Sequence, residues 1–126
     1  MLQKFANNTA NATAYVAALF TGMNVIYERD LDVTLNQGTL ILRTSGTADP
    51  FAEPGGDIGN QLDEFGEVWV ASHSGVTRAF SMQLSGKSPN PNSAAGVAWV
   101  LGNGNYCSQT NLVFNGQKYQ LFPYEP

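Results

Sequence analysis

The sequence of 126 residues contains one cysteine, one histidine and six basic residues, and these low counts narrow the possible functions. A single cysteine, Cys107, cannot form a disulfide within the chain, and one cysteine with one histidine cannot complete a tetrahedral zinc site. We therefore expect no metal and no other cofactor. The lysines and arginines form no patch and the formal net charge is −4, so we expect no nucleic-acid partner.

Long hydrophobic runs are also missing. No stretch of about eighteen apolar residues occurs, so we expect no membrane span. The N-terminal sequence MLQKFANNTANAT lacks the apolar core and the small-residue cleavage site of a signal peptide. Hydrophobic residues nevertheless make up 43% of the chain and charged residues only 13%, a composition that predicts a single globular domain over residues 1–126.

Two segments, residues 7–28 and 57–72, show the apolar spacing of amphipathic helices. Their apolar side chains recur at alternating intervals of four and three, so one face of each predicted helix belongs to the core. These positions are Ala12, Val16, Leu19, Met23 and Ile26 in the first helix, and Ile58, Leu62, Phe65 and Trp69 in the second. Asp57 is placed to cap the second helix.

Four further segments are β-prone. Residues 31–45 predict one long strand bent at Gly38, with a hairpin turning at residues 36–38 as the alternative. Residues 78–86 alternate apolar and polar side chains, which predicts a strand with one buried face. Residues 97–101 form a short apolar strand, and the pair Asn115-Gly116 predicts a C-terminal β-hairpin.

Candidate catalytic groups are few. His73 could act as a general base with a neighbouring carboxylate, but no Ser-His-Asp or Cys-His arrangement is visible in the spacing. Asp63 and Glu67 are one helical turn apart on the second helix, which favours a solvated face over a catalytic pair. Residues 85–88 (SGKS) lack the preceding glycine of a phosphate-binding loop, and prolines follow them.

The order of these elements resembles the N-terminal part of the adamalysin (reprolysin-like) metzincins, a family of zinc peptidases. ANATAYVAALFTGMNVIYERDLDVTLNQGTLILRTS is similar to their first helix and second strand, and LDEFGEVWVAS to their second helix. TRAFSMQLSGKSPNPNSAAGVAWVLGNGNYC resembles their third strand, the loop after it, the edge strand and the following cysteine. The resemblance covers residues 5–110.

The resemblance implies a zincin-like half domain of the α/β class. We expect a small mixed β-sheet, with two parallel strands plus an antiparallel edge strand, two packed helices and the C-terminal β-hairpin. In the family the edge strand pairs with an extended peptide substrate. The corresponding candidate peptide-binding residues in this chain are Gly96, Val97, Ala98, Trp99 and Val100.

The resemblance also shows what this chain lacks. The family continues into a helix with the motif HExxHxxGxxH, which binds zinc and supplies the general base, whereas residues 111–126 contain no histidine. We therefore expect no zinc and no peptidase activity. Cys107, which pairs with a later cysteine in the family, is expected to be a free thiol or to form an intermolecular bridge. The resembled family is mostly secreted.

The family's first strand, which precedes its first helix, is also missing from this sequence or reduced to MLQKF. A half domain without the zinc helix and this strand would leave apolar surface and a strand edge uncovered. We expect the C-terminal hairpin to cover part of this surface and two chains to cover one another as a homodimer. The resulting interpretation is a catalytically incomplete, metzincin-derived domain with a binding or self-association role. The alternatives are a truncated fragment of a secreted zinc metallopeptidase and an unrelated enzyme that uses His73. Aromatic candidates for partner contacts are Trp99, Tyr106, Phe114, Tyr119 and Phe122.

Overall fold

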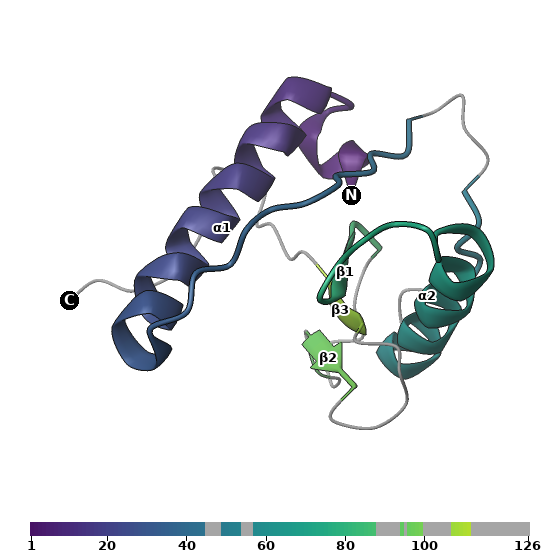
Figure 1. Ribbon diagram of the computed structural model, residues 1–126. Helices are drawn as coiled ribbons and strands as arrows, with labels where there is room; N and C mark the ends of the chain where they lie inside the picture. The colour runs from purple at the N-terminus through teal and green to yellow at the C-terminus, as the bar shows by residue number, and fades with distance from the viewer. Residues whose placement is uncertain (45–48, 54–56, 88–93, 95, 100–106, 112–126) are drawn as a thin grey trace. The chain divides into compact units, whose positions relative to one another are not determined.

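The computed structural model (Figure 1) describes residues 1–44, 49–53, 57–87, 94, 96–99 and 107–111. The chain divides into two compact units, one that includes Leu2–Leu42 and one that includes Arg43–Val113. Each unit is described by itself, and the single-domain organisation stays a prediction.

The first unit consists of a short 3-10 helix, η1 (Leu2–Phe5), and the long helix α1 (Thr9–Leu31). The N-terminus of α1 is capped by Asn8, whose side-chain oxygen accepts a hydrogen bond from the backbone N–H of Asn11 over 3.0 Å. Its C-terminus is capped by Asp32, a residue in the left-handed conformation (φ 54°) whose N–H donates to the carbonyl of Glu28. The helix predicted over residues 7–28 is confirmed, with an end three residues further on.

The chain after α1 runs back along this helix without forming a strand (Figure 1). Asn24 holds it in place, because the Asn24 side chain accepts the N–H of Leu35 over 2.7 Å and donates to its carbonyl over 3.0 Å. One amide thus satisfies both backbone groups that a neighbouring strand would otherwise pair. The strand predicted over residues 31–45 is therefore wrong for residues 31–44, where α1 ends at Leu31 and no strand follows.

The second unit contains helix α2 (Ile58–Ser72) and three strands: β1 (Ser81–Ser85), β2 (Gly96–Ala98) and β3 (Cys107–Asn111). The predicted second helix is confirmed, and Asp57 caps it by accepting a hydrogen bond from the N–H of Asn60 over 3.0 Å. Together with α1, these elements confirm the mixed α/β class. The predicted hairpin at Asn115-Gly116 lies outside the described residues.

The three strands form one sheet in the order β1-β3-β2. β1 runs parallel to β3, with Ser81 opposite Cys107, and β2 runs antiparallel to β3, with Gly96 opposite Thr110. The central strand, β3, was not predicted from the sequence, because Cys-Ser-Gln-Thr-Asn has no apolar alternation.

Helix α2 packs on one face of this sheet. Its buried side chains Leu62 and Phe65 form a core cluster on which Phe51, Trp69 and Val97 pack. Val97 and Gln83 both lie opposite Gln109 of β3, so Gln83 belongs to the same sheet face as Val97, the face that α2 covers. Ser81 and Ser85, two residues before and after Gln83 on β1, belong to this face as well. Ser81 and Ser85 are accordingly only 4% and 7% exposed.

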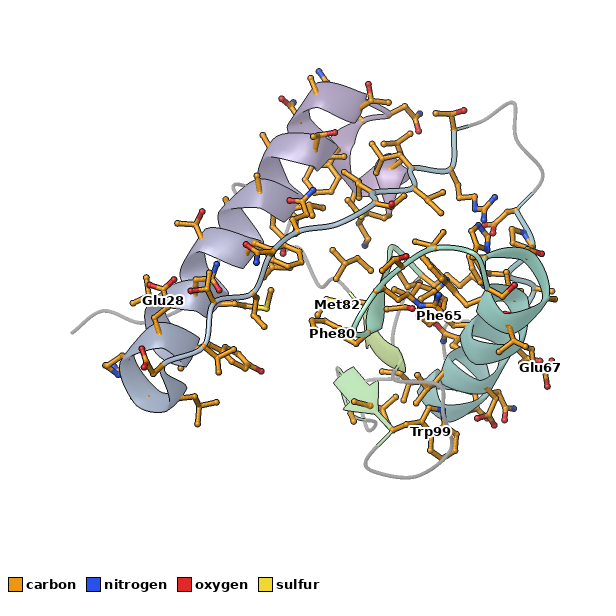
Figure 2. All side chains as sticks on the ribbon, viewed as in Figure 1. Glu28, Phe65, Glu67, Phe80, Met82 and Trp99 are labelled. Atoms are coloured by element: carbon orange, nitrogen blue, oxygen red, sulfur yellow. The ribbon has the colours of Figure 1, made fainter. Side chains whose placement is uncertain are left out.

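The opposite face of β1 is the more apolar one. Met82 and Leu84 alternate with the buried serines, and Phe80, immediately before the strand, is 40% exposed. Figure 2 shows Phe80 and Met82 together at β1, on the side away from Phe65 of α2. Within the described residues of this unit, α2 is the only helix and it covers the other face.

Candidate functional site

The candidate peptide-binding edge is β2. Among the described strands it pairs with β3 alone, so its second edge has no strand partner. In an antiparallel arrangement alternate residues direct both their N–H and C=O groups to the same side. A strand of three residues therefore offers the backbone groups of one or two residues to an added strand.

The side chains of β2 divide into one anchor and two small exposed positions. Val97 is half-buried and packs against Leu62 and Phe65, which fixes the strand on α2. Gly96 and Ala98 are exposed, and their small size leaves room for the side chains of a neighbouring strand. Trp99 directly follows β2 and is 45% exposed (Figure 2). The fifth predicted residue, Val100, lies outside the described residues.

A row of three aromatic rings, Phe51, Phe65 and Trp69, belongs to the same core as Val97, which packs against Leu62 and Phe65. The ring centroids of Phe51 and Phe65 are 6.0 Å apart, and those of Phe65 and Trp69 are 5.8 Å apart in an edge-to-face arrangement. A guanidinium group stands at each end, with Arg43 5.8 Å from the centre of the Phe51 ring and Arg78 4.7 Å from that of Trp69. Such contacts add specific geometry to the apolar packing.

Phe51 reaches this row because residues 49–53, here called the Phe51 strap, are clamped from two sides. The Glu64 carboxylate of α2 accepts the N–H of Ala52 over 2.6 Å and that of Glu53 over 3.1 Å. The ammonium group of Lys87, just after β1, donates to the carbonyls of Phe51 and Glu53. The clamp thus joins the Phe51 strap to α2 and to the segment that follows β1. Among the carboxylates of α2, Glu64 holds the strap, whereas Asp63 and Glu67 are exposed.

His73 caps the C-terminus of α2, and its ring packs beside an aromatic ring of the same helix. Its ring lies 4.7 Å from that of Trp69, and its backbone N–H donates to the Trp69 carbonyl over 3.0 Å. Its Nδ1 atom is buried and has no hydrogen-bond partner among the described residues. The guanidinium of Arg78 donates to the carbonyls of His73 and Val76 and to the Ser81 hydroxyl. The described contacts of the imidazole include no carboxylate, so nothing here supports a catalytic pair at His73.

The described part of the chain contains no group of three or more histidine, cysteine, aspartate or glutamate side chains placed to hold a metal ion. None of its helices has the length and apolar character needed to cross a membrane. Cys107 is the first residue of β3. The aromatic candidates Tyr106, Phe114, Tyr119 and Phe122 lie outside the described residues.

The comparisons with family models, with curated proteins and with solved structures give no match to this chain. The metzincin resemblance therefore stays a hypothesis that rests on the quoted segments and their order.

Proposed function

We propose that this chain is a catalytically incomplete, metzincin-derived domain that binds polypeptides, and that β2 pairs with an extended peptide. The observation that carries the proposal is the arrangement of β2, which is anchored on α2 through Val97 and has a second edge with which no strand of the described residues pairs. The antiparallel position of β2 at an edge of the described sheet is in line with the half domain that the resemblance implies. The parallel partner expected for residues 78–86 was the strand over residues 31–45, but residues 31–44 form no strand and β1 pairs parallel with β3 instead.

The proposal assigns no hydrolytic role to these 126 residues. A metzincin zinc site needs three histidines, which come from one helix and the segment that follows it, and the chain contains one histidine in total. What the half domain retains is the edge strand, and strand addition requires only backbone hydrogen bonds and room for side chains.

A three-residue edge predicts weak binding. A peptide hydrogen bond contributes about 0.5–1.5 kcal/mol net, so two to four such bonds contribute at most about 6 kcal/mol, and we expect a Kd in the range of about 40 μM or weaker. The exposed ring of Trp99 is the side chain placed to add to this affinity.

The test is fluorescence anisotropy with a labelled decapeptide of alternating Val and Thr, compared with the same peptide N-methylated at every second residue. We expect saturable binding in the stated range, at least tenfold weaker binding of the N-methylated peptide that cannot donate along its pairing edge, and about three- to tenfold weaker binding to Trp99→Ala. Val70→Ala, which removes another exposed apolar side chain of the same unit, is the matched control. Equal binding of both peptides would contradict strand addition.

We also propose that the domain self-associates as a homodimer. The support is the apolar side of β1 with its exposed Phe80, because uncovered apolar surface next to a strand edge favours association. Size-exclusion chromatography with light scattering at micromolar concentration tests this, and a clean monomer would contradict it.

A further inference from the structure

The second edge of the sheet lies at β1, on the far side of β3 from β2. β1 pairs with β3 through one edge, and no described strand pairs with the other. Proteins usually protect such edges with charged residues, prolines or bulges. The five residues of β1, Ser-Met-Gln-Leu-Ser, include none of these protective residues.

The two cationic side chains that flank β1, Arg78 and Lys87, already donate hydrogen bonds to backbone carbonyls of the same unit. Arg78 donates to the carbonyls of His73 and Val76, and Lys87 donates to the carbonyls of Phe51 and Glu53. Neither cation is therefore free to block an approaching strand. The edge is uncharged and five residues long, about 16 Å at the usual rise of a strand.

The sequence of β1 is complementary to itself when it is reversed about Gln83. An antiparallel copy centred there places Ser81 opposite Ser85, Met82 opposite Leu84, and Gln83 opposite Gln83. Every pair matches small with small, apolar with apolar or amide with amide. This is the condition for an isologous contact, in which the same patch of two subunits meets around a two-fold axis.

We infer that β1 pairs antiparallel with β1 of a second copy of this chain, with the two-fold axis at Gln83. The three-stranded sheets of the two copies then join into one continuous sheet. This inference gives a geometry to the homodimer proposed above and rests on it. It does not involve β2, whose peptide-binding edge remains open in the dimer.

The side chains next to β1 fit this arrangement. The two Gln83 amides each carry a donor and an acceptor, so they can bond to one another across the axis. Phe80, 40% exposed in one chain, is placed opposite Gly86 of the partner copy, where its ring can cover a residue without a side chain. Phe80, Met82 and Leu84 of both copies then line one apolar face of the joined sheet.

A charge-exchange experiment tests the pairing in the full chain. Gln83→Glu and Gln83→Lys each place two like charges at the axis, and we expect each variant to dimerise at least tenfold more weakly than the wild type. An equimolar mixture of the two should restore a dimer, specifically the mixed one, which native mass spectrometry identifies. Gln37→Glu, the same change at an exposed position of the other unit, is the control and should stay dimeric. Restoration by mixing separates a broken interface from a misfolded variant.

Disulfide trapping tests the register independently. In a Cys107→Ser background, Gln83→Cys should form a disulfide-linked dimer with itself, because directly opposed residues lie within bridging distance. Ser81→Cys should not, because residues 81 of the two copies are about 13 Å apart, but it should form a bridge when mixed with Ser85→Cys.

A wild-type monomer would overturn both the homodimer and this geometry. A wild-type dimer that survives in both charged variants, or that bridges through Ser81→Cys alone, would overturn the geometry and leave the homodimer standing. Decapeptide binding by Gln83→Glu, measured in the same samples, reports on β2 separately and should be unchanged.

Discussion

Replacement of Glu64 tests whether the Phe51 strap is held by the clamp described above. In Glu64→Gln the side chain keeps its length and one accepting carbonyl oxygen, but it loses its charge and carries an NH₂ group in place of the other oxygen. In Glu64→Ala the acceptor is absent altogether. Glu64→Ala leaves the N–H groups of Ala52 and Glu53 without their present partner, whereas Glu64→Gln removes the charge and one of the two accepting oxygens.

The magnitude follows from the geometry. A hydrogen bond to a charged group contributes about 1.5–3 kcal/mol when it is shielded from water. Two such bonds are made here, at 2.6 and 3.1 Å, but Ala52 is exposed and water can replace part of the loss. We therefore expect Glu64→Ala to lower the free energy of unfolding by about 2–3 kcal/mol and Glu64→Gln by about 1–2 kcal/mol.

The assay is urea denaturation followed by tryptophan fluorescence, because Trp69 packs in the aromatic row that the strap supports. Glu67→Gln is the matched control, since it makes the same chemical change on the exposed side of the same helix (Figure 2). It should shift the free energy of unfolding by less than about 0.5 kcal/mol. If Glu64→Gln and Glu67→Gln have the same effect, the strap is not held by the Glu64 carboxylate.

Three further predictions concern other parts of the chain. Ala6 has a positive φ of 50°, so Ala6→Gly should raise the free energy of unfolding by about 1 kcal/mol, whereas Ala14→Gly inside α1 should lower it by a similar amount, both measured by urea denaturation. Burial raises the pKa of Tyr15 above its ordinary value of 10.0. The contribution of Tyr15 to the free energy of unfolding is therefore fully present below about pH 10 and is lost as the pH rises through the raised pKa. Tyr15→Phe should therefore lose less stability than the wild type above this pH, and parallel pH profiles would refute the effect. The proposed dimer pairs without a covalent bond, so oligomer size should be the same with and without reductant, and a dimer that falls apart on reduction would instead indicate a bridge through Cys107.

The helices could be predicted because their signal is local. Apolar side chains three and four residues apart define one face of a helix wherever the segment packs, and Asn8 and Asp57 provide caps within the same turn. Strands depend on neighbours from elsewhere in the chain. Residues 33–44 have a β-prone composition, but the backbone groups of Leu35 bond to Asn24 of α1 instead. β3 is polar and is a strand because β1 and β2 flank it.

The candidate site shows the same division. The position of Gly96–Ala98 followed from the family resemblance, and these residues do lie at an edge of the described sheet, while peptide binding there remains a proposal. The clamp could not be predicted, because Glu64 and Lys87 bond to backbone groups 11 to 36 residues away in the sequence. The contacts of Arg78 with the Trp69 ring and the His73 carbonyl were also missed, because a single arginine in the sequence gives no signal for either partner.

The most direct test of the peptide-binding role is a titration of the ¹⁵N-labelled protein with the Val/Thr decapeptide, followed by NMR and amide hydrogen exchange. Strand addition predicts that the largest shift changes occur in β2 and at the Trp99 indole, and that one or two β2 amides gain protection from exchange. The N-methylated peptide should leave these amides unchanged. Shift changes confined to other segments, or none in β2 at millimolar peptide, would contradict the proposed function.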